Sequence, residues 1–144
     1  MVCMQGQSEG GLDAALTRIG DRWSLLVVNA LLGGPLRFNQ LQETLGGIAT
    51  NVLSQRLKSL EQLGVVVATP YSERPPRYAY GLTAPGQELA GAVRLLTRWG
   101  ADQAGELAEG PVHLECGTPL EARWYCPTCS RMLADDERED PGFI

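Results

Sequence analysis

The sequence has 144 residues, which suits one domain or one domain with a small appendage. Hydrophobic residues make up 44% of the chain, so it can bury a core, but no apolar run approaches the roughly eighteen residues of a membrane-spanning helix. The net charge of −5 would argue against a nucleic-acid-binding protein if it were spread evenly along the chain.

The charge is divided between two regions of opposite sign. Residues 22–82 carry six basic side chains against three acidic ones, whereas residues 101–144 carry ten acidic side chains against three arginines. The central region therefore keeps the positive balance that a DNA-binding surface needs. The N-terminus has neither a basic start nor an apolar stretch, so we expect a cytoplasmic protein with reduced cysteines.

Three helices are predicted after a flexible, polar arm at residues 1–10. Apolar side chains recur every three or four residues in 11–19, 22–32 and 37–45, as they do on one face of a helix. Asp21 stands where it can cap the second helix, and a Gly-Gly-Pro run ends it. The side chains expected to face inward are Leu12, Ala15, Leu16, Ile19, Trp23, Leu26, Val27, Ala30, Phe38, Leu41 and Leu45.

Residues 49–64 are predicted to form the helix that carries the function. Thr50 is placed to cap its start, and Gly64 to end it in the left-handed conformation. The spacing of four leucines puts them on one face of this helix, opposite a polar face: Leu53, Leu57, Leu60 and Leu63. The polar face is either the solvated side of an ordinary surface helix or a surface that reads DNA. A glycine pair joins this helix to the preceding one, as in a helix-turn-helix.

A β-hairpin is predicted directly after this helix. Residues 65–71 are rich in β-branched side chains, and residues 77–82 alternate between large and small ones, which is typical of strands. The connecting SERPP tip is polar and holds Arg74, with Arg77 just beyond it. A helix followed by a basic-tipped hairpin is the outline of a winged helix, in which the helix enters the major groove of DNA.

This outline defines a set of candidate DNA-binding residues. Those on the polar face of the helix are expected to face bases, and the two arginines of the hairpin to meet the DNA backbone or the minor groove. In chain order the candidates are Arg37, Thr50, Asn51, Ser54, Gln55, Lys58, Arg74 and Arg77.

Residues 85–107 are predicted to form a long final helix, capped by Thr83 and with Pro85 in its first turn. An apolar stripe runs along it, formed by Leu89, Val93, Leu96 and Trp99, to which Leu107 can be added. The stripe either covers the core of its own domain or forms a dimer interface. A dimer is the expected arrangement, because the helix extends beyond a small domain that is already complete.

Five motifs follow one another along the chain: Gly-x-x-Trp at Gly20–Trp23, Arg37-Phe38, L-x-x-R-L-x-x-L-x-x-x-G, PPRYAY and LT-x-x-G. Together they resemble the HxlR-type winged helix-turn-helix transcriptional regulators of prokaryotes over about residues 10–100. The resemblance implies a homodimer built from the first and last helices. It also implies a palindromic operator, with one recognition helix on each half-site.

Some members of that family sense oxidants or electrophiles through a cysteine about ten residues before the glycine that matches Gly20. In this sequence Gly10 occupies the corresponding position, and Cys3 lies seven residues further upstream. The sequence therefore departs from the family's thiol switch, and we expect no oxidant response through Cys3.

The resemblance does not extend to residues 113–129, which contain the single histidine and three of the four cysteines. The spacing is ligand-x2-ligand, nine residues, then ligand-x2-ligand, with the four positions being His113, Cys116, Cys126 and Cys129. Two such turns on a short hairpin, with strands from the LEARWY run, suit a tetrahedral structural Zn²⁺ site. The alternatives are a site without metal and a reducible Cys126–Cys129 pair.

The predicted fold is mainly α with a small β-hairpin, a winged helix-turn-helix followed by a zinc-ribbon-like unit. Its parts are a flexible arm at 1–10, the DNA-binding and dimerisation domain at 11–109, the ribbon at 110–133 and an acidic tail at 134–144. An enzyme is not expected, because a zinc hydrolase needs an open coordination position that four protein ligands would fill.

The predicted function is transcriptional regulation, with double-stranded DNA and a second copy of the chain as partners. The alternative is a protein-interaction module, in which the ribbon and the tail bind a partner and the winged helix is a scaffold. No membrane association is expected. A small-molecule effector is compatible with the sequence but unknown, because aromatic residues such as Trp23 and Trp99 can line a pocket but are more often part of a core.

Overall fold

The computed structural model describes residues 10–106, 111–134 and 137. Most of the N-terminal arm, with Cys3, and most of the acidic tail lie outside the described residues, as does Leu107. The chain forms two compact units, one ending at Val93 and one beginning at Arg94. The domain boundaries expected at residues 10, 109 and 133 stay predictions. None of the helices in the described part of the chain has the length and apolar character to span a bilayer.

The first two helices match their predicted ranges closely. Helix α1 is Gly11–Ile19 and helix α2 is Arg22–Leu31. The predicted cap is confirmed, because the Asp21 carboxylate accepts a hydrogen bond of 3.1 Å from the backbone N–H of Ser24. This bond satisfies an amide that has no partner within the helix.

The helix-turn-helix is formed by α3, Phe38–Thr44, and α4, Thr50–Gln62. The prediction that Thr50 caps α4 is wrong, because Ala49 is the N-cap and its side chain offers no acceptor. Thr50 is the first residue of the helix, and its hydroxyl accepts a hydrogen bond from the side-chain amide of Gln42. Gly64 follows the end of α4 with a φ of +71°, as predicted.

A three-stranded antiparallel sheet follows, in the order β1-β3-β2. Strands β2, Val66–Glu73, and β3, Pro76–Leu82, are both longer at the tip than predicted, so only residues 74–75 lie between them. Strand β1, Leu36–Arg37, was not predicted, because two residues are too few to show a period. Its residues pair with Tyr80 and Ala79 of β3.

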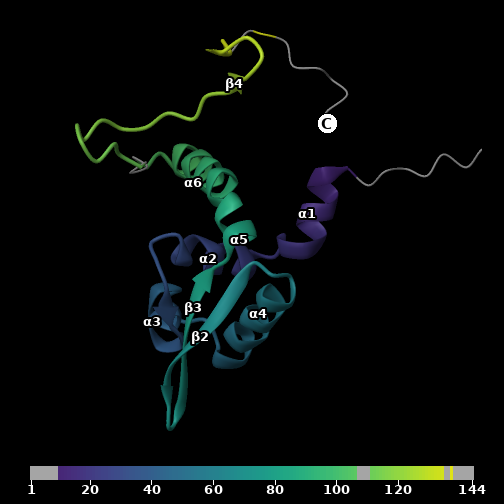
Figure 1. The fold of residues 1–144 in the computed structure, drawn as a ribbon, viewed down its shortest axis with the longest axis vertical. Coiled ribbons are helices and arrows are strands. Elements are labelled where there is room, and N and C mark those ends of the chain that lie inside the picture. The colour runs from purple at the N-terminus through teal and green to yellow at the C-terminus, as the bar shows by residue number, and fades with distance from the viewer. Residues whose placement is uncertain (1–9, 107–110, 135–136, 138–144) are drawn as a thin grey trace, which may run out of the picture. The chain divides into compact units, whose positions relative to one another are not determined.

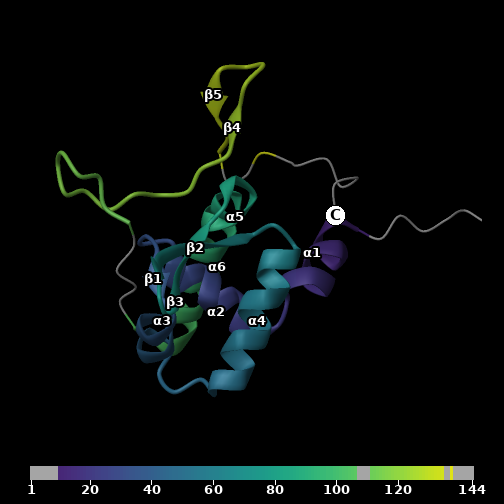
Figure 2. The ribbon, with the colours of Figure 1, turned by 60° about the horizontal axis from the view of Figure 1, so that its bottom comes forward.

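The core of the first unit is formed by apolar side chains of the helix-turn-helix and its neighbours. Helix α2 packs against both α3 and α4 (Figure 2), and α4 lies beside β2 (Figure 1). The buried hydrophobic residues are Val27, Val28, Leu31, Leu41, Ile48, Leu53, Leu57, Leu60, Val66 and Val93. Three of the four leucines predicted on the inner face of α4 are therefore buried, whereas Leu63, at the end of the helix, is exposed.

The long final helix is interrupted, contrary to prediction. Helix α5 is Ala84–Glu88, and helix α6 is Ala90–Ala104. The N–H of Leu89 bonds to the carbonyl of Gly86, three residues back, so α5 ends in a tighter turn before α6 begins. The cap predicted at Thr83 is confirmed, because its hydroxyl accepts a hydrogen bond of 3.2 Å from the N–H of Gly86.

Helices α1 and α6 leave apolar side chains uncovered. Leu12 is 74% exposed and Leu16 is also exposed, so the prediction that both face inward is wrong within one chain. On α6 the stripe is divided, because Val93 is buried while Leu96 and Trp99 are exposed. None of the residues that the structure describes buries Leu96 or Trp99.

The second unit contains, beyond α6, two short antiparallel pairings. Strand β4, Tyr125–Cys126, pairs with β5, Arg131–Met132, and an isolated bridge joins Val112 to Pro119. The LEARWY run was expected to supply the strands, but only its final tyrosine lies in one. A five-residue stretch, 120–124, separates the two pairings and has no regular secondary structure.

Candidate nucleic-acid interface

The outward face of α4 is polar and open to solvent. Asn51, Ser54, Gln55 and Lys58 are all exposed, and the opposite side of the helix is held by buried leucines. A helix anchored in this way presents its polar side chains from a rigid support, which is what contact with base edges requires. The structure therefore brings four of the predicted DNA-binding residues together on one surface.

The turn between α3 and α4 is fixed by a residue that the sequence did not single out. The side-chain amide of Gln42 donates one hydrogen bond to the carbonyl of Ile48 and another to the hydroxyl of Thr50, each 3.1 Å long. Gln42 thus ties the two helices of the helix-turn-helix together at the start of α4. No sequence pattern pointed to this role, because the contact spans eight residues and depends on the angle of the turn.

The inner edge of α4 carries an ion pair with α2. The Arg56 guanidinium lies 3.4 Å from the Asp21 carboxylate. In the sequence, Arg56 was one of the six basic residues that give residues 22–82 their positive balance. Partial burial of Asp21 opposes its ionisation, but hydrogen bonds from Ser24 and the charge of Arg56 outweigh this and lower the pKa of the carboxyl. Arg56 is therefore a residue that positions α4 rather than a free cation.

The wing presents three exposed arginines from two strands and their connection. Arg37 ends β1, Arg74 lies at the tip, and Arg77 belongs to β3. The Arg37 guanidinium lies over the ring of Tyr71, 4.4 Å from its centre, in a cation–π contact. Tyr71 was predicted only as part of a strand, and it holds the Arg37 side chain against the hairpin.

The four predicted metal ligands lie in the second unit, in two separate turns. Nδ1 of His113 is 3.3 Å from Sγ of Cys116, and the backbone N–H of Cys129 donates to Sγ of Cys126 over 3.5 Å. Hydrogen bonding by Thr118 lowers the pKa of the Cys116 thiol, and the N–H of Cys129 lowers that of Cys126. Within the residues that the structure describes, no three His, Cys, Asp or Glu side chains are already gathered around one point.

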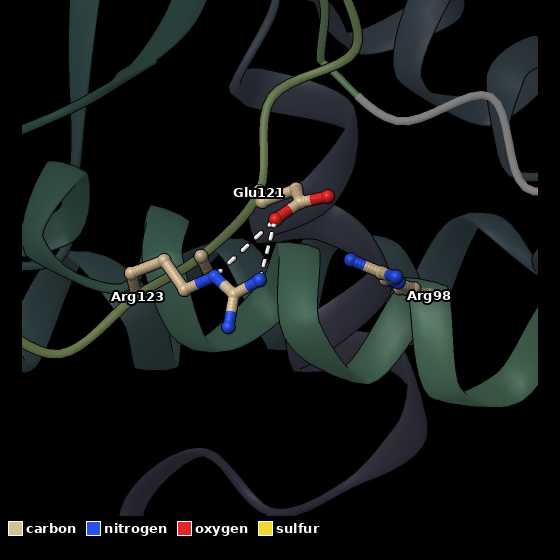
Figure 3. A pocket seen from close by; sticks show the side chains of 4 residues that line it. Arg98, Glu121 and Arg123 are labelled. Atoms are coloured by element: carbon tan, nitrogen blue, oxygen red, sulfur yellow. Dashed lines mark hydrogen bonds and ion pairs between the residues drawn. The ribbon is translucent and has the colours of Figure 1, made fainter. Parts of the chain in front are cut away.

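A polar hollow of about 240 Å³ in the second unit is lined by Arg98, Glu121, Ala122 and Arg123. Figure 3 shows the Arg123 guanidinium turned toward Glu121, with hydrogen bonds of 2.8 and 3.2 Å to one carboxylate oxygen. This ion pair is exposed, so it contributes little to stability. Among the described residues that line the hollow there is no aromatic side chain.

Residues 18–107 match the HxlR-like helix-turn-helix family. An uncharacterised HTH-type transcriptional regulator of Mycobacterium tuberculosis is 36% identical over 143 residues, which cover 96% of this chain and 87% of that protein. The HTH-type transcriptional regulator YodB of Bacillus subtilis is 35% identical over 92 residues, which cover 64% of this chain and 81% of the relative.

Solved structures show the same likeness. The crystal structure of PA1607, a candidate transcription factor, superposes with a TM-score of 0.74 at 31% identity, covering 94% of this chain and 96% of that one. Reduced YodB from B. subtilis superposes with a TM-score of 0.55 at 33% identity, covering 72% and 94% of the two chains. The similarity to PA1607 therefore extends past residue 107, where the family match ends.

Proposed function

The chain belongs to the HxlR-like helix-turn-helix family, and on that premise we propose that it regulates transcription as a homodimer on a palindromic operator. Its relatives are transcriptional regulators of the helix-turn-helix type and not enzymes, in agreement with the sequence prediction. DNA is accordingly its partner. The dimer, the operator symmetry and the contact residues are the parts that we propose here.

The observation that carries the proposal is the division of α4 into a buried and an exposed face. In the proposed complex α4 enters the major groove, with Asn51, Ser54, Gln55 and Lys58 toward the bases. Asparagine and glutamine can each form two hydrogen bonds with adenine, and lysine can donate to guanine. These side chains supply the selectivity of binding, and Thr50 lies at the end of the helix where a phosphate can approach.

The hairpin supplies contacts that do not depend on sequence. Arg74 and Arg77 are exposed at and beside its tip, where they can meet the DNA backbone or the minor groove. Arg37 is exposed at the base of the wing and is placed for a phosphate by its contact with Tyr71. Each phosphate contact releases counterions, so this part of the binding weakens as salt rises.

The uncovered apolar side chains of α1 and α6 support the homodimer. Leu12 and Leu16 on α1, and Leu96 and Trp99 on α6, are exposed in the single chain. Large exposed apolar side chains grouped on particular helices mark a surface that another molecule covers. In the proposed dimer a second copy covers these side chains. The two recognition helices of the dimer, one from each copy, then face successive major grooves about one helical turn apart.

Selection of bound duplexes from a random pool tests this function directly. The expected result is an inverted repeat whose half-site centres lie about 10 base pairs apart. A salt titration on random duplex separates this proposal from the interaction-module alternative, which the comparisons do not favour. Binding that falls steeply with salt supports the DNA-binding surface, whereas no enrichment and no binding at low salt would contradict it.

A further inference from the structure

The two turns that hold the predicted metal ligands are the same structure repeated thirteen residues apart. In the first, the bridge between Val112 and Pro119 closes a turn that begins with His113 and contains Cys116. In the second, the pairing of Tyr125 with Met132 closes a turn with Cys126 and Cys129 at the matching positions. The two ligands therefore stand at the same places between paired residues in both turns.

The residue after the second ligand has the same backbone conformation in both turns. Gly117 follows Cys116 with a φ of +69°, and Ser130 follows Cys129 with a φ of +52°. Among the described residues Ser130 is the only one other than glycine with a positive φ. A serine there is less favourable than a glycine, so another interaction must offset the cost of this backbone conformation. The shared conformation indicates that both turns meet the same geometric requirement.

The ligand atoms of the first turn are already spaced for a shared ion. Zinc–nitrogen and zinc–sulfur bonds at a tetrahedral angle place the two ligand atoms about 3.5 Å apart. Nδ1 of His113 and Sγ of Cys116 are 3.3 Å apart. In the second turn, the N–H of Cys129 donates to Sγ of Cys126, a bond that stabilises a thiolate.

Nothing apolar in the described residues explains how these turns are held. All described residues from 111 to 132 are exposed except Cys126, which is only half-buried. Leu114 is 97% exposed and Trp124 is 70% exposed, so the large apolar side chains do not form a core. A segment this small, without a core, usually folds around a metal or a disulfide.

We propose that the two turns close on one Zn²⁺ ion held by His113, Cys116, Cys126 and Cys129 of the same chain. The ion displaces the thiol protons of the three cysteines into solvent, and neutral His113 binds through Nδ1. Four protein ligands leave no open position, so the ion is structural. The five residues 120–124 have no regular structure and can span about 17 Å when extended, which allows the turns to meet.

Native mass spectrometry and cobalt substitution of the full-length protein test the site. Reduced protein loaded with Zn²⁺ and dialysed is expected to keep one ion per chain, and Co²⁺ in its place is expected to show the visible spectrum of a tetrahedral three-thiolate site. His113→Ala and Cys129→Ser should each lower zinc affinity at least about tenfold. Loss of a residue that only supports a metal ligand already lowers affinity about tenfold or more, and loss of the ligand itself should cost no less.

Matched variants separate ligands from neighbours. Glu115→Gln and Thr128→Ala change the middle residues of the two turns and should keep one zinc per chain. Ser130→Gly should also keep the metal and bind it at least as tightly, since glycine adopts a positive φ freely. Circular dichroism and DNA binding report on the first unit. A ligand variant that loses zinc because the whole chain has failed to fold is recognised by the loss of both signals.

Three results would overturn the proposal. One is protein that holds no zinc after loading and dialysis while residues 111–132 remain ordered by NMR. Another is one zinc for every two chains, which would mean that cysteine pairs from two copies share the ion. The last is a Cys129→Ser variant that keeps its zinc affinity and its cobalt spectrum.

Discussion

Asp21 and Arg56 join the start of α2 to the middle of α4 through an ion pair of 3.4 Å. The same carboxylate caps α2 by accepting a hydrogen bond from the N–H of Ser24. Asp21 therefore has two partners, one that stabilises a helix end and one that belongs to the proposed recognition helix. This pairing connects the stability of the fold to the position of the surface that meets DNA.

Replacing Asp21 should reduce stability in a pH-dependent manner. Asp21→Ala should lower the free energy of unfolding by about 1 kcal/mol at neutral pH through loss of the cap. Asp21→Asn keeps a capping oxygen but removes the negative charge, so it measures the contribution of the charge separately from that of the cap. The folded-state pKa of Asp21 lies below its ordinary value of 3.8, so the charge stabilises above that pH and the effect is lost as pH falls through the folded pKa.

Urea denaturation of the wild type and Asp21→Asn from pH 7 to pH 3 measures this effect. The difference between the two proteins should be constant near neutrality and should shrink at the acidic end. A difference that does not change with pH would mean that the charge of Asp21 contributes nothing to folding. Arg56→Gln should show the same trend, since it removes the other partner.

Replacing Arg77 and replacing Gln55 should change DNA binding in different ways. Arg77→Ala should weaken binding to every duplex and reduce the slope of affinity against salt by about one unit, because one phosphate contact is lost. Gln55→Ala should instead relax selection at one base position of the half-site. Fluorescence anisotropy across salt concentrations and across single-base operator variants measures both.

Arg123→Ala is the charge-matched control for Arg77→Ala. It also removes one positive charge, but from an exposed ion pair with Glu121 in the second unit. It should leave the salt slope unchanged, because an acidic segment is repelled by phosphate and is expected to stay away from DNA. If Arg77→Ala and Arg123→Ala behave alike, the proposed docking of the wing is wrong.

The exposed apolar side chains of α1 and α6 should control assembly. Leu12→Ser and Leu96→Ser should each shift the monomer–dimer equilibrium toward the monomer, since each removes apolar surface that the dimer would bury. Val67→Ser, an exposed position on β2, should leave the equilibrium unchanged. Sedimentation velocity over a concentration series measures all three. Dimerisation unaffected by both leucine variants would place the interface elsewhere.

Gly86 and Gly91 should respond in opposite directions to alanine. A Cβ at Gly86 would lie 2.2 Å from the carbonyl oxygen of Val65, so Gly86→Ala should destabilise the first unit by about 1–3 kcal/mol. A Cβ at Gly91 meets nothing within 4 Å, so Gly91→Ala should stabilise α6 by up to about 1 kcal/mol. Thermal unfolding followed by circular dichroism compares the pair. Equal effects would mean that the close approach at Gly86 is relieved by movement of Val65.

The sequence by itself determined the parts of this protein that depend on neighbours along the chain. The leucine spacing of α4 and the caps at Asp21 and Thr83 depend on residues three or four apart, and each strand of the hairpin shows in its own local composition or alternation. The motif series also identified the family, and the ligand-x2-ligand spacing located both turns of the second unit.

Only the tertiary structure decided what depends on residues far apart in the sequence. Strand β1 exists because β3 pairs with it. Thr50 is not the N-cap of α4 as predicted, because the preceding turn puts Ala49 at the N-cap position. Gly86 is required because Val65 approaches it, although the sequence shows only a glycine in a motif. Local periodicity predicts which face of a helix is apolar, but whether that face is covered depends on packing, and on α1 and α6 part of it stays open.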